Sequence, residues 1–326
     1  MTENFDISAF YAAGRPFAIY RLPGDGELRQ ADAGCSFLVA PWPGRVADAV
    51  DVGTCAPGPD NEPLWTRSTP RQEYIESTSR LVDHLRQTGG KCVRMRTRCA
   101  TGRRVDINAA VSSLFAHYPD AFCHCYYTPA TGLWLGATPE LLLEWRNGHV
   151  GTMALAGTRR ADSPGRWDTK NVREQAYVTD YVTDVLRSKG LEPELEETGT
   201  LRYGGIEHIC TRIKARVAGD FDPMTLIDRL SPTPAVAGMP IAAAMDEISE
   251  IEDAPRRCYA GWVAIRRADC LQAYVNLRCA QLSDSGWCIY AGGGITAESD
   301  PEAEWRETEA KSAVLSEILM NNSREK

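Results

Sequence analysis

The sequence predicts an α+β fold in which large, mostly antiparallel sheets are covered by helices. Segments typical of strands and segments typical of helices come in clusters, whereas a doubly wound parallel sheet needs strict alternation of the two. The 326 residues are enough for one large or two ordinary domains. A hydrophobic content of 43% and a charged content of 25% are those of a globular chain, and no internal repeat stands out.

Charge and composition exclude several classes of function. A net charge of -8 argues against a nucleic-acid partner, which would favour a basic patch. No apolar run is long enough to span a bilayer, so we expect no membrane association. Residues 1–6 lack the basic start and apolar core of a signal peptide, so we expect a cytoplasmic protein. The eleven cysteines form no CxxC pair, which favours reduced thiols over a zinc site.

The positions of Gly and Pro, together with hydrophobic periodicity, predict the helices and strands along the chain. Residues 1 to about 70 read as strands and loops, with strand-like segments at 17–22 and 35–40. A helix begins at 68–70 and ends at Gly89-Gly90. The remaining elements, in order, are a strand at 91–96, a helix at 105–118, a hairpin of 121–127 with 133–137, an apolar run at 138–145, a strand at 153–160, a helix headed by Asn171, strands at 204–209 and 211–217, a helix at 223–230, a dense turn at 231–240, a helix at 241–251, strands at 259–265 and 272–282, and a strand at 287–295.

The final helix carries charges on the face that should turn inward. Ser299 and Asp300 are good N-cap residues before Pro301, and Glu302 has capping-box spacing from Ser299. One stripe of this helix contains Glu304, Glu307, Lys311, Val314 and Ile318. Its later members are apolar, so its early charges need partners or a ligand. The simpler interpretation is a solvated first turn with Glu307 and Lys311 as a surface pair.

The helix headed by Asn171 shows the same pattern, because Glu174 precedes the apolar stripe of Val178, Val182 and Val185. Two helices that each turn carboxylates toward the core suggest a shared cation. Carboxylate oxygens without nearby histidine or thiol ligands fit Mg²⁺ rather than zinc.

Three further residues each allow a structural and a functional interpretation. Lys91 shares a strand face with Val93 and Met95. It is either a structural lysine whose stem packs at the end of the strand or a catalytic group. Glu140 lies between a turn and an apolar run. It is either a simple cap or a carboxylic acid whose pKa is raised by its apolar surroundings. His208 lies in an apolar setting, where a satisfied core histidine is more common than a ligand.

These parts together resemble the chorismate-utilising enzymes, which include isochorismate synthases, salicylate synthases and the large subunits of anthranilate and aminodeoxychorismate synthases. The fold that this resemblance implies is a single α/β sandwich of two large sheets with outer helices, like that of anthranilate synthase component I. Residues 1–70 then look like a shortened N-terminal part, and residues 70–326 like the chorismate-binding catalytic region of one structural domain. The segments that carry the resemblance are 91–96, 137–143, 155–159, 174–178, 207–211, 232–240, 259–261, Arg278 and 290–311.

The resemblance also implies roles for individual residues. Lys91 matches the base that activates water, and Glu140 matches the general acid that protonates the departing C4 hydroxyl. Glu174 and Glu307 match Mg²⁺ ligands, with Glu304 as a ligand or a holder of water. The positions that match substrate-binding residues are Gly157, Thr158, Ala235, Arg278, Gly292, Gly293, Gly294 and Lys311.

Two features favour the isochorismate synthase branch of the family. Anthranilate-type members place Gln where this chain has Lys91, although aminodeoxychorismate synthases can keep a lysine. The turn at 232–235 looks like the isochorismate synthase version, whereas amine-transferring members carry Gly-Thr or Gly-Ser. We therefore expect Mg²⁺-dependent conversion of chorismate to isochorismate by a monomer without an obligatory glutaminase subunit.

Three alternatives stay open at this point. A salicylate synthase would go on to eliminate pyruvate, and an amine-transferring enzyme would use ammonia. A catalytically weakened partner subunit is suggested by departures from the family pattern, since Asn171 stands where an acid is common and Gln175 and Ser231 stand where histidine is usual. For the leading prediction, an isochorismate synthase, we expect a role in siderophore, menaquinone or secondary-metabolite biosynthesis.

Overall fold

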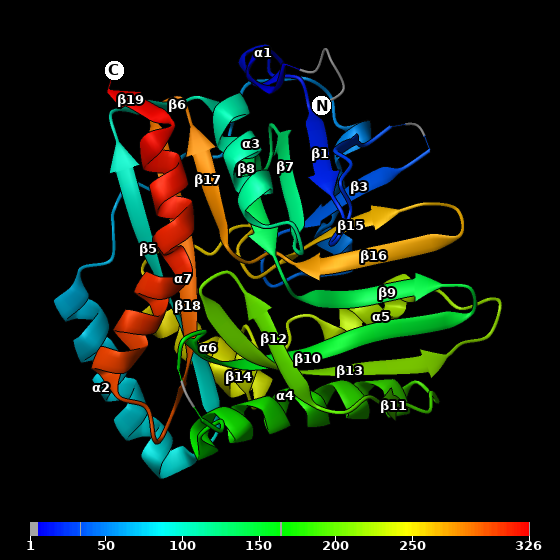
Figure 1. Cartoon of the computed structure of the whole chain (residues 1–326), viewed down its shortest axis with the longest axis vertical. Coiled ribbons are helices and arrows are strands. Elements are labelled where there is room, and N and C mark those ends of the chain that lie inside the picture. The colour runs from blue at the N-terminus through cyan, green and yellow to red at the C-terminus, as the bar shows by residue number, and fades with distance from the viewer. Residues whose placement is uncertain (1–5, 33, 164, 326) are drawn as a thin grey trace.

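The computed structural model describes residues 6–32, 34–163 and 165–325. Residues 1–5, on which the expected absence of a signal peptide rests, lie outside this part of the chain. Two large sheets make up the molecule, and every strand pairing in them is antiparallel. In Figure 1 the strands of one sheet run close to vertical and those of the other close to horizontal. The predicted α+β class with mostly antiparallel sheets is confirmed.

The eight-stranded sheet has the order β14-β5-β18-β17-β8-β7-β1-β2. Its strands span Gly238–Met239 (β14), Lys91–Thr101 (β5), Gly286–Thr296 (β18), Cys279–Ser283 (β17), Gly132–Thr138 (β8), Phe122–Thr128 (β7), Phe17–Arg21 (β1) and Arg29–Gln30 (β2). The nine-stranded sheet has the order β11-β13-β10-β9-β16-β15-β3-β4, with β12 also on β13. Its strands span Glu194–Leu195 (β11), Ile206–Arg216 (β13), His149–Arg160 (β10), Leu141–Arg146 (β9), Cys270–Val275 (β16), Trp262–Arg266 (β15), Ser36–Ala40 (β3), Val50–Asp51 (β4) and Gly199–Tyr203 (β12).

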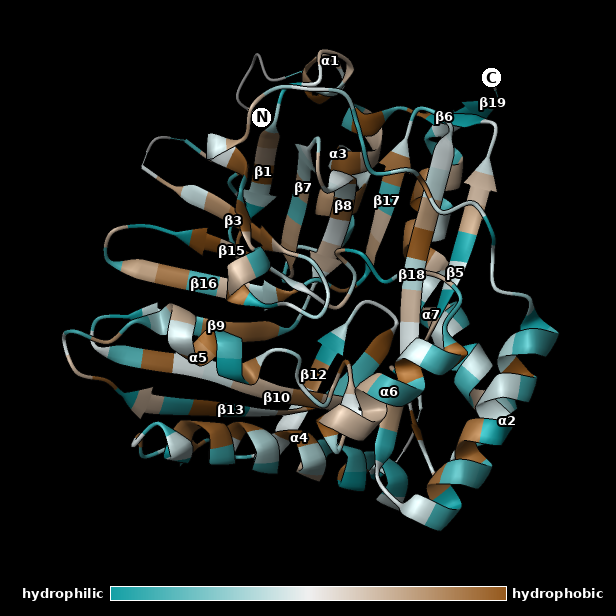
Figure 2. Ribbon diagram, turned by 180° about the vertical axis from the view of Figure 1, so that it is seen from behind, coloured by the Kyte–Doolittle hydropathy of each residue, from teal (hydrophilic) through white to brown (hydrophobic). Residues whose placement is uncertain are grey.

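Helices cover the outer faces of these sheets. They span Ile7–Ala12 (α1), Arg71–Thr88 (α2), Ile107–His117 (α3), Thr169–Ser188 (α4), Pro223–Leu230 (α5), Ile241–Ile251 (α6) and Pro301–Asn321 (α7), with short 3-10 turns at Val46–Asp48 and Val52–Thr54. A small sheet joins Arg103–Val105 (β6) to Ser323–Glu325 (β19). Figure 2 shows hydrophobic and hydrophilic colours alternating along α2 and α4. Within the described ranges, no helix is both long enough and apolar enough to cross a membrane.

The core forms on both faces of the eight-stranded sheet. One buried cluster includes Phe37, Tyr126 and Trp134 between the two sheets, and it extends to Trp262 and to residues of α4 and α5. A second cluster packs α3 and α7 onto the other face of this sheet. Strands from the first 70 residues pair with later ones, β1 with β7 and β3 with β15. Removing these side chains from water supplies the main stabilisation of the sandwich.

Local sequence explains where the two site-bearing helices begin. The Asp168 carboxylate accepts a hydrogen bond from Asn171 N at the start of α4. Asp300 caps α7 by accepting from the backbone of Glu302 and Ala303, and Pro301 occupies the first turn. The expected capping box between Ser299 and Glu302 is wrong, because the Ser299 hydroxyl instead donates to the Glu304 carboxylate at 2.7 Å.

Three other expectations need correction. Residues 272–282 are not one strand, since β16 lies in one sheet and β17 in the other. The chain crosses between the sheets at 276–278, where Arg278 has a φ of 49° that an ordinary strand residue does not adopt. Residues 206–216 form the single strand β13 rather than two segments, and helix α1 was not expected within the first 70 residues.

Candidate functional site

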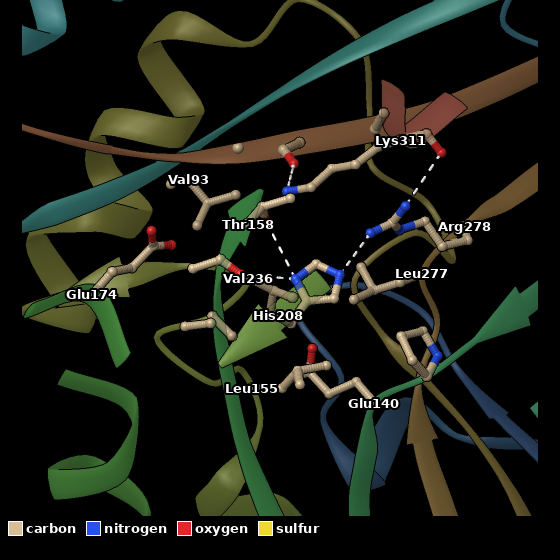
Figure 3. Close-up of a pocket in the computed structure, with 18 of the residues that line it drawn as sticks. Val93, Glu140, Leu155, Thr158, Glu174, His208, Val236, Leu277, Arg278 and Lys311 are labelled. Atoms are coloured by element: carbon tan, nitrogen blue, oxygen red, sulfur yellow. Dashed lines mark hydrogen bonds between the residues drawn. The ribbon is translucent and has the colours of Figure 1, made fainter. Parts of the chain in front are cut away.

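The last residues of β18 form an open edge inside the molecule. Strand β17 pairs with β18 only as far as Tyr290, while β5 continues to pair up to Thr296. Within the part of the chain that the structure describes, no strand therefore covers one edge of the segment 291–296. A cavity of about 60 Å³ lies against this edge, and its lining includes Glu140, Gly157, Thr158, Glu174, His208, Ala235, Arg278, the three glycines 292–294 and Lys311. Figure 3 shows Glu140, Glu174, Arg278 and Lys311 on different sides of it.

The three glycines let side chains approach β18 more closely than any other residue would. A Cβ at Gly294 would lie 2.2 Å from Glu174 Oε1 and 2.6 Å from Lys91 Cε. A Cβ at Gly292 would lie 2.7 Å from the Tyr259 hydroxyl, and one at Gly293 would lie 3.2 Å from Glu304 Oε2. The glycine run is thus required for close packing of charged groups against the strand.

Lys91 and Glu174 meet beside Gly294. The distance from Lys91 Nζ to Glu174 Oε1 is 2.8 Å, and the Lys91 side chain has no exposed surface. This contact is an ion pair without hydrogen-bond alignment, so the donors of the ammonium group remain unused by the described residues. Glu174 itself lines the cavity, which places Lys91 directly behind the wall.

Glu304 and Glu307 extend the charged cluster along α7. Lys170 Nζ donates to Glu304 Oε1 at 2.7 Å, and Lys311 Nζ donates to Glu307 Oε1 at 2.6 Å and to Gly292 O at 2.9 Å. Burial and the neighbouring Glu307 raise the pKa of Glu304 to about 7. Burial would also raise the pKa of Glu307, but Lys311 and Lys170 lower it below its usual value.

Glu304 and Glu307 do not line the first cavity. They line a second cavity of about 520 Å³, which also contacts Lys170, Asn171 and Asp300. Thr158 lines both cavities. The ion pair between Lys311, on the first cavity, and Glu307, on the second, therefore lies between the two spaces.

Glu140 is a buried carboxylic acid. It has 3% exposure, and burial raises its pKa to about 7, although Lys91, Lys311 and Arg278 each favour its ionised form. Its position is fixed by the backbone, since Val275 N donates to Glu140 O at 3.0 Å across the start of β9. A carboxyl group with this pKa can give up a proton near neutral pH.

His208 connects Arg278 to the turn at Gly157. His208 Nδ1 lies 2.9 Å from Gly157 O, so this nitrogen carries the proton, and Nε2 accepts from Arg278 Nη2 at 3.1 Å. Burial, Arg278 and Lys311 lower the pKa of His208 to about 3, so the ring is neutral. His208 is buried and hydrogen-bonded, as expected, but it also lines the cavity and positions a cation there.

The three residues that depart from the family pattern each form hydrogen bonds with neighbouring segments. Asn171 Oδ1 accepts from Thr158 N at 2.9 Å, and its amide donates to Asp168. Gln175 donates to Ala154 O and to Thr211, and Ser231 donates to Pro43 O. Each substitution therefore holds a neighbouring segment in place rather than leaving a gap.

The carboxylates fit a hard cation in chemistry, although they now face lysines. Among the described residues, no three His, Cys, Asp or Glu side chains are gathered closely enough to hold an ion as they stand. Glu304 Oε2 is nevertheless buried without a hydrogen-bond partner in the described part of the chain. Both Glu304 and Glu307 lie beside Gly293. Oxygen ligands of this kind are typical of Mg²⁺ sites. The set fits Mg²⁺ if Glu174, Glu304 and Glu307 turn from their lysines toward the ion.

The structure thus brings the sequence-predicted residues into one region. All eight expected substrate-binding positions line the first cavity together with Glu140 and Glu174, while Lys91 lies behind it and Glu304 and Glu307 border the second cavity. Sequence reasoning did not single out Lys170, and it named Tyr259 only within the segment 259–261 that carries the family resemblance. Lys170 directly precedes Asn171 and continues the charged start of α4, which is the one signal that could have pointed to it.

Comparisons with known proteins identify the family of this chain. Residues 56–320 match the family model described as "Chorismate binding enzyme". The isochorismate synthase MenF of Escherichia coli is 31% identical over 225 residues, which are 65% of this chain and 52% of MenF. The chain thus spans about half the length of this curated relative.

Solved structures share the fold. A putative 2,3-dihydroxybenzoate-specific isochorismate synthase, DhbC, of Bacillus anthracis aligns with a TM-score of 0.81 at 21% identity, covering 95% of this chain and 97% of that one. Anthranilate synthase component I of Streptococcus pneumoniae aligns with a TM-score of 0.65 at 22% identity, covering 79% and 60%. Because the family model matches more than half of this chain, the chain belongs to the chorismate-binding enzymes.

Proposed function

We propose that this protein is an isochorismate synthase, which adds water at C2 of chorismate while the C4 hydroxyl leaves. The observation that carries the proposal is that a buried acid, Glu140, lines the cavity while a buried lysine, Lys91, lies behind its wall in contact with Glu174. The reaction needs one group to give a proton and another to take one, and these two groups have the required chemistry. The similarity to MenF supports the same branch of the family.

The proton transfers follow from the chemistry of the reaction. Lys91 in its neutral form accepts a proton from water as the water oxygen forms its bond to C2. Both conjugated double bonds of the ring shift, one from C1–C2 to C1–C6 and the other from C5–C6 to C4–C5, and the bond from C4 to its hydroxyl oxygen breaks. Glu140 protonates that oxygen, which leaves as water. One water enters and one leaves, so product and substrate are isomers.

Positive groups around the cavity suit a substrate with two carboxylates. Arg278 is held by His208, and Lys311 is held by Gly292 O and Glu307, so both cations are positioned before substrate enters. The free edge of β18 adds backbone amides of the glycine run. Together these groups would orient the ring carboxylate and the enolpyruvyl carboxylate of chorismate.

Mg²⁺ is part of the proposal, with Glu174, Glu304 and Glu307 as its ligands. When bound, the ion would supply positive charge to hold the ring carboxylate of the substrate. Glu174 would then leave its contact with Lys91, and Glu304 its contact with Lys170. We further propose that the chain acts as a cytoplasmic monomer and needs no glutaminase subunit, because water rather than ammonia is the nucleophile.

Incubation of the pure protein with chorismate and Mg²⁺, with and without ammonium, tests the proposal directly. Chromatography with mass spectrometry should find isochorismate in both samples, and a Glu140→Gln control should form about a hundredfold less. Salicylate with pyruvate would identify the lyase alternative, and an aminated product that depends on ammonium would identify the amine-transferring one. Chorismate that binds but stays unchanged would favour a partner subunit and would contradict the proposal.

A further inference from the structure

A pair of cysteines lies outside the cavity and takes no part in the proposed reaction. Cys99 on β5 is directly opposite Cys288 on β18, and the Cys99 thiol donates to Cys288 Sγ at 3.0 Å. We propose that Cys99 and Cys288 form a thiol–disulfide site, which a low-molecular-weight disulfide such as oxidised glutathione converts to an intramolecular cross-strand disulfide.

The backbone geometry at this pair suits the bond. Cys99 N donates to the Ser68 hydroxyl at 2.9 Å, and that hydroxyl donates back to Cys99 O at 3.3 Å. The polar backbone groups of Cys99 therefore point away from β18, which makes Cys99 and Cys288 a non-hydrogen-bonded pair. Cα atoms in such a pair lie about 4.5 Å apart, within the range of about 4.4–6.8 Å that disulfides span. The two sulfur atoms need to move only about 1 Å closer to reach a bond length of about 2.05 Å.

This pair is distinct from the other thiols. All eleven cysteines are free, and within the described residues Cys99 and Cys288 are the one pair of thiols in direct contact. Most of the others are single buried thiols. Cys55 and Cys270 are partly exposed, like Cys99, but contact no second thiol among the described residues, so neither can complete an intramolecular bond without a large movement.

The two sulfurs have different environments, which fixes the order of steps. Cys99 is half-buried, with Sγ 3.4 Å from Arg67 O near the surface, whereas Cys288 is fully buried. Burial raises the pKa of Cys288 far above its usual value, so it is the poorer initial nucleophile. The Cys99 thiolate attacks one sulfur of oxidised glutathione, forms a mixed disulfide and releases one glutathione thiolate. The Cys288 thiol then loses its proton, attacks Cys99 Sγ and releases the second glutathione. Two protein thiols are oxidised, and one glutathione disulfide is reduced to two thiols.

The bond would join the two strands that hold the site. Strand β5 begins at Lys91 and β18 ends with the glycine run, so the disulfide would fix their register. Cys288 also lies on the same strand face as Tyr290, which lines the cavity and stacks on Trp134 and Tyr259 with ring centroids 5.4 and 5.8 Å away. Because the bond closes a long loop in the unfolded chain, the oxidised protein should melt at a higher temperature.

The test uses the full folded chain with graded oxidised glutathione, followed by acid trapping, proteolysis and mass spectrometry. We expect one dominant cross-link between the Cys99 and Cys288 peptides, reversed by dithiothreitol, together with a higher Tm. The Cys288→Ser variant should stop at glutathione on Cys99, and the Cys99→Ser variant should leave Cys288 unmodified. The Cys55→Ser and Cys270→Ser controls should form the cross-link like the wild type. A stable mixed disulfide on wild-type Cys99, a dominant cross-link elsewhere, or thiols at both positions while Cys55 and Cys270 react would overturn the proposal.

Discussion

Lys91 and Glu174 form an ion pair inside the protein, with Nζ 2.8 Å from Oε1 and with 0% and 10% of their side chains exposed. The loss of one partner from such a pair leaves the other charge uncompensated, which costs about 3–5 kcal/mol. The pair is therefore important for stability as well as for the proposed reaction. Experiments on either residue need to separate these two contributions.

Replacement of Lys91 separates the two contributions. Lys91→Ala and Lys91→Gln should still bind chorismate but should lose isochorismate formation, because no base remains to take the proton from water. Without Mg²⁺, both variants should have a lower Tm than the wild type. Mg²⁺ should raise the Tm of Lys91→Gln more than it raises the Tm of the wild type, because the ion supplies the missing charge beside Glu174. The measurements are product formation and thermal unfolding at matched Mg²⁺. A lower Tm with near-normal specific activity would make Lys91 a structural residue and remove it from the mechanism.

The pair also depends on the absence of a side chain at Gly294. In Gly294→Ala the new Cβ would meet Glu174 Oε1 at 2.2 Å and Lys91 Cε at 2.6 Å, so both groups must move. Turnover should fall by at least about tenfold, because misplaced catalytic groups lose their alignment. Gly26→Ala is the matched control, since nothing lies within 4 Å of its Cβ position. Equal activity of the two variants would show that the position of the pair does not matter.

Glu140→Gln should keep the shape of the site and lose its proton. Chorismate should bind with similar affinity, while turnover falls by about a hundredfold or more. In the wild type, kcat/KM should decline as the pH rises through about 7, since the acid then loses the proton that it must donate. That decline should be missing from the residual activity of the variant. Wild-type turnover in Glu140→Gln would mean that another group protonates the leaving hydroxyl.

The same residue should affect stability in the opposite sense from an ordinary carboxylate. The pKa of Glu140 is raised from 4.5 to about 7, so the folded state binds the proton more tightly. Its contribution is fully present below pH 4.5 and is lost as the pH rises through about 7. The difference in unfolding free energy between the wild type and Glu140→Gln should therefore shift in favour of the variant over this range. The difference in unfolding free energy between the wild type and Glu304→Gln should change with pH in the same direction, because burial also raises the pKa of Glu304 to about 7.

Metal dependence should follow from the acids on α4 and α7. Glu174→Ala and Glu307→Ala should abolish Mg²⁺-dependent chorismate binding in calorimetry, because each removes a proposed ligand. Glu196→Ala is a suitable control, since this acid pairs with Lys214 at the surface and lines neither cavity. Unchanged binding in either test variant would remove that residue from the metal site.

Much of the fold could be predicted, because local signals determine it. The helices at 223–230 and 241–251 begin and end where Pro and the apolar period indicated. Strands β7 and β8 form the hairpin that was expected for 121–127 with 133–137. The crossing at 276–278 could not be predicted, because nothing local distinguishes a strand that changes sheets from one that continues. There Arg278 takes a positive φ, and tertiary contacts such as the hydrogen bond from Asn276 to Cys258 O hold the crossing.

For the site, residue types could be predicted but their partners could not. The inward-facing acids at 174, 304 and 307 were expected from helical periodicity, and each lies on the expected face. That Lys91 pairs with Glu174, and Lys170 with Glu304, depends on packing between segments far apart in the chain. His208 was expected as a core residue because a single sequence does not reveal that Arg278 lies against its ring.

The source of the oxygen at C2 of the product tests the central claim most directly. The enzyme is incubated with chorismate and Mg²⁺ in water enriched in oxygen-18, and the isochorismate is analysed by mass spectrometry with fragmentation. If water is the nucleophile, each product molecule should carry one heavy oxygen, located in the C2 hydroxyl. Isochorismate without label would mean that the C4 hydroxyl migrates within the substrate, and it would contradict the role proposed for Lys91.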